Sequence, residues 1–419
     1  METIKIINFI IGIVFFVCYS YQFFYILIPF VKKEKPHKNT ELHRYAVLIS
    51  ARNEELVIGN LLDSIAAQDY PSRLVNVFVV ADNCTDSTAQ IAREHGAAVY
   101  ERFNKAEVGK GYALEYLIDK ILEEYGDVFD AYMVFDADNL LSEDYISRMN
   151  ETFSDGYGII TSYRNSKNYG DNWISAGYAL WFLREAKYLN NARFLLGTSC
   201  AVSGTGFLFS REVMQRCGGW PFHLLVEDIE FTVSNIINGE KVGYCPKAVL
   251  YDEQPTSFRQ SWRQRMRWAR GYIQILQRYG AGLLKGIFKK RSFSCFDMTM
   301  NIAPAVILSF AGIIINAGAG IYSVATGGGT DILLQSFSEL VINTYLMMFV
   351  IGAITTITEW KNIYCSTPKK VLYAFTFPLF MLTYLPICIT ALFKPVKWEP
   401  IVHNRVRTLS EVRNDCPAA

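Results

Sequence analysis

Long apolar runs near both ends of the chain constrain its fold most. Residues 6–31 carry no charged side chain and exceed the roughly 20 residues that a helix needs to cross a bilayer. Further apolar runs cover residues 298–326, 332–358 and 371–393, whereas the charged residues concentrate between about 32 and 295. We therefore expect a membrane protein with a large water-soluble insert. The balance of 41 Lys+Arg against 40 Asp+Glu argues against a nucleic-acid binder, which usually has a basic excess.

The flank of the first apolar run predicts its orientation. The run is too long for the apolar region of a signal peptide, and no small-residue cleavage site follows it. The basic sequence KKEKPHK (32–38) follows instead, and such flanks lie on the cytoplasmic side of a membrane. The first helix is therefore predicted to run inward, with a cytoplasmic insert behind it. The sequence GGGTD (327–331) is predicted to be an outer turn between two spanning helices.

The last apolar run, residues 371–393, leaves two alternatives open. Lysines stand on both sides of it, so both ends look cytoplasmic. Pro378 and Pro386 would break a helix in two places. The run is either a re-entrant or broken element that its neighbours support, or a plain fourth span with an external tail. We favour a cytoplasmic tail.

The nine cysteines are scattered and form no CxxC pair. This pattern indicates neither a zinc site nor a disulfide framework. It suits a reduced compartment in which single thiols serve as small buried groups.

The insert begins with alternating strands and helices. Strands are expected at 46–50, 75–81, 97–100 and 131–135. We expect one helix to begin near Asn53, a second to end at His95 and a third to cover residues 111–125. This alternation predicts a doubly wound, Rossmann-like α/β sheet. Ligands of such sheets bind at the carboxyl ends of the strands.

Acidic residues stand at two of those strand ends. Asp82 follows the second strand, and Asp136 and Asp138 follow the fourth. An Asp-x-Asp pair in a tight turn suits a divalent cation held by carboxylates and substrate phosphates. The alternative is a solvated turn.

Two later motifs carry further chemistry. The acids Glu227 and Asp228 lie between apolar residues. Asp228 is either the cap of a following helix or a partly desolvated general base. The sequence QRMRW (264–268) provides arginines that can neutralise a diphosphate and a tryptophan that can face a sugar. Its alternative is an amphipathic helix at the membrane surface.

In this order the motifs resemble those of the membrane-integrated, processive family 2 glycosyltransferases, which include cellulose, chitin and hyaluronan synthases. The resemblance covers about residues 45–272, and QRMRW fits the QxxRW pattern of processive members. It implies an α/β GT-A domain inserted between transmembrane α-helices. The corresponding boundaries are a membrane helix and basic flank (1–35), the GT-A domain (36–256), interfacial helices (257–296), a membrane region (297–393) and a cytoplasmic tail (394–419).

The resemblance also implies roles for individual residues, with Mg²⁺ or Mn²⁺ as cofactor. Asp228 would be the general base beside Glu227, and Asp138 would hold the metal. The acceptor sugar would meet Trp268 and Gln264. The donor, a UDP-sugar, would contact the following residues: Asp82, Lys110, Asp136, Asp138, Arg265 and Arg267.

Three further segments have two interpretations each. Ser203–Gly206 is a turn before a strand, or by analogy it lies beside the acceptor, with contacts from Gly204 and Thr205 and with glycines that let a sugar approach the backbone. Residues 172–196 form a packed helix, or an interfacial helix that docks the domain on the bilayer. His403 in the tail is a surface histidine, or a site residue as in some family members.

The leading prediction is a processive, inverting β-glycosyltransferase in the plasma membrane, multi-pass, with the catalytic domain in the cytoplasm. It would polymerise UDP-glucose into a cellulose-like or mixed-linkage β-glucan and export the growing glycan. Alternatives are a chitin, hyaluronan or poly-GlcNAc-type synthase using UDP-GlcNAc, a single transfer to a lipid acceptor, and a transporter or receptor that only binds nucleotide. With so few membrane segments, a channel would be narrow or shared between protomers. A shared channel would be compatible with a homo-oligomer.

Overall fold

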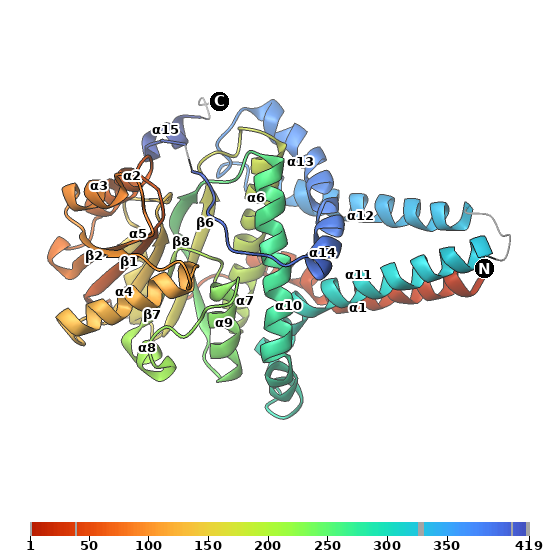
Figure 1. The fold of residues 1–419 in the computed structure, drawn as a ribbon, viewed down its shortest axis with the longest axis horizontal. Helices are drawn as coiled ribbons and strands as arrows, with labels where there is room; N and C mark the ends of the chain where they lie inside the picture. The colour runs from red at the N-terminus through yellow and green to blue at the C-terminus, as the bar shows by residue number, and fades with distance from the viewer. Residues whose placement is uncertain (1, 38–39, 326–330, 404, 416–419) are drawn as a thin grey trace.

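The computed structural model describes residues 2–37, 40–325, 331–403 and 405–415, and it consists of an α/β domain joined to a group of long apolar helices (Figure 1). Most of the turn predicted at 327–331, and Cys416, lie outside the described residues. The other cysteines are free thiols.

Within the described residues, eight strands form one mixed sheet in the order β3-β2-β1-β4-β7-β6-β8-β5. The strands β1 to β4 pair in parallel, as the alternating pattern predicts. The strand β7 runs antiparallel to both β4 and β6, and β8 runs parallel to β6. The strands are β1 (Tyr45–Ala51), β2 (Val75–Asp82), β3 (Ala98–Arg102), β4 (Ala131–Asp136), β5 (Leu140–Leu141), β6 (Ile159–Ser166), β7 (Phe207–Ser210) and β8 (Val242–Asp252).

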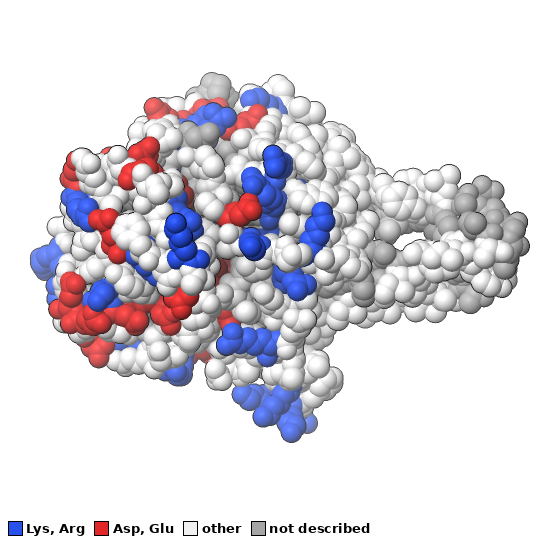
Figure 2. All heavy atoms as spheres, viewed as in Figure 1, with Lys and Arg blue, Asp and Glu red and all other residues white. Residues whose placement is uncertain are grey.

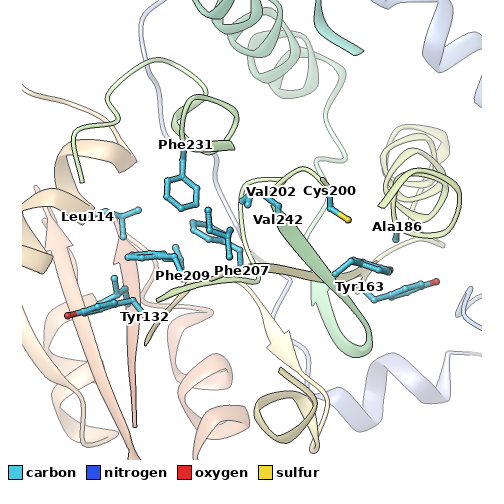
Figure 3. Packing of buried hydrophobic residues seen from close by; sticks show 14 of the residues in the cluster. Leu114, Tyr132, Tyr163, Ala186, Cys200, Val202, Phe207, Phe209, Phe231 and Val242 are labelled. Atoms are coloured by element: carbon cyan, nitrogen blue, oxygen red, sulfur yellow. The ribbon is translucent and has the colours of Figure 1, made fainter. Parts of the chain in front are cut away.

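Helices cover both faces of the sheet because successive strand residues point to opposite sides. In β1, Leu48 packs toward α4, α6, α8 and α9, whereas Ile49 packs toward α2, α3 and α5. Figure 3 shows the first of these cores, with Phe231 of α9 above Phe207 of β7 and Leu114 of α4 nearby. The helices are α2 (Ile58–Ala66), α3 (Thr88–Glu94), α4 (Lys110–Tyr125), α5 (Tyr145–Ser154), α6 (Trp173–Arg184), α8 (Arg211–Cys217) and α9 (Glu227–Ile237).

The helix α2 begins at Ile58, later than the start expected near Asn53. The loop after β1 is held instead by the loop after β2. Asn53 has a positive φ of 58°, its side chain accepts a hydrogen bond from the Thr85 backbone (2.8 Å), and Thr88 Oγ1 accepts one from the Glu54 backbone (2.8 Å). These contacts keep the chain non-helical at the carboxyl end of the sheet, where it forms one wall of the site.

Long helices extend from the α/β domain. These are α1 (Glu2–Val31), α10 (Phe258–Phe288), α11 (Phe293–Ala325), α12 (Asp331–Thr358), α13 (Thr367–Leu382) and α14 (Tyr384–Phe393). In the described residues, three stretches are long and apolar enough to cross a membrane: Ile6–Val31, Phe337–Thr358 and Thr367–Phe393. Figure 1 shows α1, α11 and α12 projecting together, and the visible face of this projection carries almost no charge (Figure 2). Asn8 and Asn316 join α1 to α11 by mutual hydrogen bonds of 2.9 Å.

The α/β domain is fastened to these helices through residues 172–196. This segment is helical throughout, as predicted: α6 continues through a π-helical segment (Glu185–Asn190) into α7 (Asn191–Leu196). The buried Arg193 of α7 donates to Asp297 of α11 at 2.7 and 3.1 Å. Two tyrosines of α1, Tyr21 and Tyr25, donate to the same carboxylate at 2.7 and 2.9 Å. One satisfied charge network therefore ties the α/β domain to α1 and α11.

The last apolar run is interrupted at one residue, and the whole stretch Thr367–Phe393 is still long and apolar enough to cross a membrane, so the choice between the two alternatives stays a prediction. The break falls at Thr383, between α13 and α14. Pro378 lies inside α13, whereas Pro386 lies in the first turn of α14, where its missing N–H costs no helical hydrogen bond. The helix α13 packs on α6, where the carbon atoms of the Phe380 ring lie close to Gly177.

Candidate active site

Three carboxylates meet at the carboxyl edge of the sheet. Asp136 and Asp138 follow β4, and Asp252 ends β8; their oxygens lie within 4.8 Å of one another. Asn139 holds the turn against β8, because its side chain accepts from the Asp136 backbone (3.1 Å) and donates to Asp252 (2.8 Å). A set of oxygen ligands alone suits Mg²⁺ or Mn²⁺. These residues therefore fit the predicted metal, and Asp252 extends the predicted ligand set.

Two basic side chains balance this acidic cluster. Arg164 of β6 donates to Asp252 through Nε (3.1 Å). The buried Lys167 donates to the backbone oxygen of Asp138 (2.8 Å) and pairs with Glu253 (3.2 Å). Burial, together with the charge of Asp138, raises the pKa of Asp252, and the Arg164 guanidinium opposes this shift. The two basic side chains offset part of the negative charge, so the carboxylates can lie close together without a bound metal. The negative charge that remains can still attract a cation.

The residues predicted to contact the donor lie along the same edge. Asp82 ends β2, where its buried carboxylate accepts from Arg102 of β3 at 2.8 Å. Lys110 is the first residue of α4 and donates to both Asp136 and the Gly204 backbone oxygen, the latter at 2.8 Å. The ammonium group therefore bridges the Asp-x-Asp turn and the Ser203–Gly206 turn. Thr205 supports the same arrangement, because its hydroxyl accepts from the Asp136 backbone at 2.9 Å.

Glu227 and Asp228 lie in the first turn of α9, which begins one residue before Asp228, with Val226 as its cap. The predicted capping role of Asp228 is therefore wrong. Glu227 is buried and Asp228 is partly exposed. Burial raises the pKa of both carboxyls, and the Asp228 charge raises that of Glu227 further. Lys110 and Arg267 oppose both shifts, so the pair lies between two cations of the predicted site.

The QRMRW residues divide into two groups on α10. Arg267 donates to the Leu225 backbone (3.0 Å) beside the acidic pair. Trp268 packs edge-to-face against Tyr178 and Phe182 of α6, with ring centroids 5.7 and 6.2 Å away.

The structure does not bring Arg265 to the carboxylates. Its buried guanidinium donates to the Phe380 backbone (3.1 Å) and to Thr383 (2.7 Å). It therefore joins α10 to the break between α13 and α14. The side-chain oxygen of Gln264 is buried without a hydrogen bond among the described residues.

The segment after α14 crosses this edge of the sheet. It runs past α10 and ends in α15 (Leu409–Asn414), which docks beside the α/β domain (Figure 1). Val402 and Glu399 are held by α10, and Trp398 lies 5.4 Å from the Arg52 guanidinium. His403 bonds to the buried carboxylate of Glu54 at 2.9 Å.

The His403 imidazole therefore faces the acidic cluster. Burial alone would lower its pKa, but the charges of Asp138, Glu54 and Glu253 outweigh burial and raise the pKa to about 10. Burial raises the pKa of Glu54, and the hydrogen bond from His403 opposes the shift. The structure thus places His403 at the site.

Residues 43–271 match the family described as Glycosyltransferase like family 2. This match covers more than half of the chain. The chain belongs to this family. It is a glycosyltransferase, and the prediction of a transporter or receptor is not supported.

The chain is similar to curated glycosyltransferases and synthases whose names give different products. The chain is 26% identical over 299 residues to a probable glycosyltransferase, YdaM, of Bacillus subtilis, covering 66% of each protein. It is 28% identical over 234 residues to the beta-monoglucosyldiacylglycerol synthase of Synechocystis, covering 54% of this chain and 47% of that protein. It is 24% identical over 261 residues to the poly-beta-1,6-N-acetyl-D-glucosamine synthase of Staphylococcus epidermidis, covering 59% and 61%. The matched segment thus spans between about half and two thirds of these relatives.

A solved structure shares the fold over nearly the whole chain. The mannosyltransferase PcManGT from Pyrobaculum calidifontis, in complex with GDP-Man and Mn²⁺, aligns with a TM-score of 0.59 and 17% identity, covering 93% of this glycosyltransferase and 99% of that chain. This likeness confirms the predicted GT-A-like fold.

Several residues of the site did not follow from the sequence: Glu54, Arg102, Arg164, Lys167 and Asp252. One signal could have found Asp252, because Asp-Glu-Gln follows an apolar strand as Asp136 does. Arg164 and Lys167 depend on the pairing of β6 with β8, Glu54 on its contact with the tail residue His403, and Arg102 on its ion pair with Asp82 of the neighbouring strand.

Proposed function

We propose that this glycosyltransferase moves a hexose from a UDP-sugar to a hydroxyl group of an acceptor at the membrane surface, with inversion. The observation that carries the proposal is the position of Asp228. Its carboxylate lies 4.0 Å from the Cβ position of Gly204, whose backbone oxygen binds the same Lys110 that binds Asp136. A base and a metal-type carboxylate cluster therefore face one site.

In the proposed reaction Asp228 accepts the proton of the acceptor hydroxyl as that oxygen attacks the anomeric carbon. The bond between this carbon and the diphosphate oxygen breaks, and its electron pair leaves with UDP. An α-linked donor would thus give a β-linked product. A divalent cation held by Asp138, with Asp136 and Asp252, would supply positive charge to the diphosphate. Lys110 and Arg267 would stabilise the same growing charge.

For the donor we propose UDP-glucose, with UDP-GlcNAc as the alternative. Asp82 would meet the nucleoside, since β2 places it beside the end of β1. The acceptor is either the end of a growing β-glycan or a lipid. The QRMRW motif favours a processive polymerase, and the poly-beta-1,6-N-acetyl-D-glucosamine synthase relative supports this. The beta-monoglucosyldiacylglycerol synthase relative supports a single transfer to a lipid.

For the location we propose a multi-pass plasma membrane protein with its catalytic domain in the cytoplasm. The basic flank after α1 supports this orientation, because it lies where the helix joins the α/β domain. The α/β domain that carries the site is joined directly to the apolar helices through Arg193 and Asp297, which suits an acceptor in the bilayer and a soluble donor.

The test is UDP release by the full chain in nanodiscs, with Mg²⁺ or Mn²⁺, across UDP-glucose, UDP-GlcNAc, UDP-galactose and UDP-glucuronate. A high-mass product that β-glucanases digest supports the glucan synthase, and one added sugar on a lipid supports the single transfer. Asp228→Asn should reduce turnover by at least about 100-fold while UDP still binds. No UDP release from any donor, or full turnover by Asp228→Asn, would contradict the proposal.

A further inference from the structure

A short segment in front of the acidic pair contacts three helices at once. Residues 222–225 have neither helical nor strand structure, and Glu227 and Asp228 follow one residue later. The three helices are α4, which begins with Lys110, α9, which begins with Glu227, and α10, which carries Arg267. We call residues 222–225 the clasp.

The backbone of the clasp lies against the first turn of α4. A Cβ at Gly111 would lie 2.0 Å from the Phe222 backbone oxygen and 3.2 Å from the His223 Cα. Backbone atoms cannot rotate out of the way as a side chain can, so only glycine permits this close approach. Because Lys110 directly precedes Gly111, the contact holds the clasp beside this cation.

The side chain of His223 fixes the same contact from the outer side. Its ring stacks on Tyr112 of α4, with the ring centroids 4.2 Å apart and the planes within 5° of parallel. Its Nε2 donates to Glu115, one turn further along α4, at 2.9 Å. The His223 side chain is 26% exposed, so it is not part of the buried core. Its contacts serve to attach the clasp to α4.

The other half of the clasp is hydrogen-bonded to α9 and α10. The Leu224 backbone donates to the Glu230 carboxylate of α9 at 2.8 Å. The Leu225 backbone oxygen accepts from Arg267 of α10 at 3.0 Å, and the Leu225 N–H donates to Gln274 at 3.3 Å. The clasp therefore joins α4 to both helices that carry the remaining charged groups.

These contacts relate the positions of groups that the proposed reaction needs together. Lys110 is anchored on the sheet side by Asp136 and the Gly204 backbone. Asp228 and Arg267 have no such anchor in the sheet, but both are connected to the clasp. Catalytic groups must be held to within about 0.5 Å of their productive geometry. The attachment of the clasp to α4 thus bears directly on the distance between base and cation.

We propose that His223 is a positioning residue for the transfer reaction. By clamping the clasp onto Tyr112 and Glu115, it sets the distance between Lys110 and the base Asp228. It acts through the clasp and does not itself touch the donor or the acceptor. This inference rests on the proposed function and adds a residue to the same site.

The first test measures kcat per UDP-binding site in the full chain in nanodiscs, with UDP binding titrated separately. His223→Ala should lower kcat per site about tenfold, because the base is displaced, while UDP affinity stays unchanged. His223→Phe retains a ring over Tyr112 and should recover part of this loss. The matched control is Tyr100→Phe, which removes a 2.6 Å hydrogen bond from β3 to Glu124 of α4 and should keep the wild-type kcat.

Two further measurements separate positioning from a general loss of stability. Tyr112→Leu should lower kcat as His223→Ala does, and the double variant should lose no more than either single variant, because both changes remove one contact. Lys110 and Arg267 oppose the raised pKa values of the acidic pair. If the base moves away from these cations, its pKa rises, and the acidic limb of the kcat/KM–pH profile of His223→Ala moves to higher pH. A smaller folded fraction alone would leave that limb in place.

The outcomes distinguish the inference from the proposed function. Wild-type kcat per site and an unmoved acidic limb in both His223→Ala and Tyr112→Leu would overturn the inference while the transferase activity stands. Fully additive losses in the double variant would also overturn it. A wild-type chain that releases no UDP from any donor would instead overturn the proposed function. If His223→Ala does not fold, as judged by UDP binding, the Tyr112→Leu result decides.

Discussion

Replacing Gly204 by alanine tests whether the acceptor lies between Arg164 and Asp228. A Cβ at Gly204 would lie 3.6 Å from Arg164 Nη1 and 4.0 Å from Asp228 Oδ2. Both are ordinary van der Waals distances, so the added methyl group displaces neither side chain. The folding cost comes from the left-handed backbone, with φ at +77°, and is about 1–2 kcal/mol for a non-glycine residue.

The effect on transfer should be much larger than this folding cost implies. An acceptor in contact with the Gly204 Cα would have to move by roughly one carbon–carbon bond, about 1.5 Å. A displacement of about 1 Å can reduce a rate on the order of 100-fold. We therefore expect kcat/KM for transfer to fall about 100-fold in Gly204→Ala, with UDP affinity unchanged. UDP release and titration of UDP binding measure the two quantities.

Gly218→Ala is the matched control. Gly218 has a φ of +73° and no heavy atom within 4 Å of its Cβ position, so it carries the same backbone cost at a distance from the site. Thermal unfolding should show similar destabilisation of the two variants. If Gly204→Ala retains as much transfer activity as Gly218→Ala, the acceptor does not pass this glycine and the reasoning fails.

Three further predictions concern the base, the metal and the docking of the domain. Burial and the Asp228 charge raise the pKa of Glu227 to about 7. Because the repulsion between the two carboxylates is mutual, Glu227→Gln should let Asp228 ionise at lower pH and shift the acidic limb of the kcat/KM–pH profile to lower pH. An acidic limb at the wild-type pH would count against this coupling. The amide oxygen in Asp138→Asn can still accept the hydrogen bond from the Glu253 backbone. The loss of the charge should nevertheless raise the Mn²⁺ concentration for half-maximal UDP release at least about tenfold. Unchanged Mn²⁺ dependence would exclude Asp138 as the ligand. In Gly177→Ala the new Cβ would lie 2.4 Å from the Phe380 ring, so the thermal midpoint should fall by the equivalent of about 1–3 kcal/mol; an unchanged midpoint would mean that α6 and α13 can separate freely.

The sequence was sufficient to predict the half of the sheet in which neighbouring strands are also close together in the chain. The apolar runs that became β1, β2 and β4 are short and contain β-branched and aromatic residues, so each strand and the acids after β2 and β4 could be recognised locally. Asp82 and Asp136 therefore appeared at the correct edge. The long apolar helices were equally local features, since length and apolar composition alone define them as candidate spans.

The remainder depended on contacts that no local pattern encodes. The pairing of β6 with β8 joins Arg164 to Asp252 across 88 residues, and a register shift inside that pair hides the alternation. The π-helical segment Glu185–Asn190 has the same composition as an ordinary helix, so no local pattern could predict it. Arg265 matched its motif, yet packing against α13 and α14 decided its position.

The site is assembled from opposite ends of the chain in order of synthesis. Glu54 is made early, and its partner His403 follows 349 residues later, after all the long apolar helices. With the proposed membrane location, these helices would be made and could enter the bilayer before the tail covers the carboxyl edge of the sheet. A ribosome-bound chain that already has the three carboxylates would then still lack the histidine beside them.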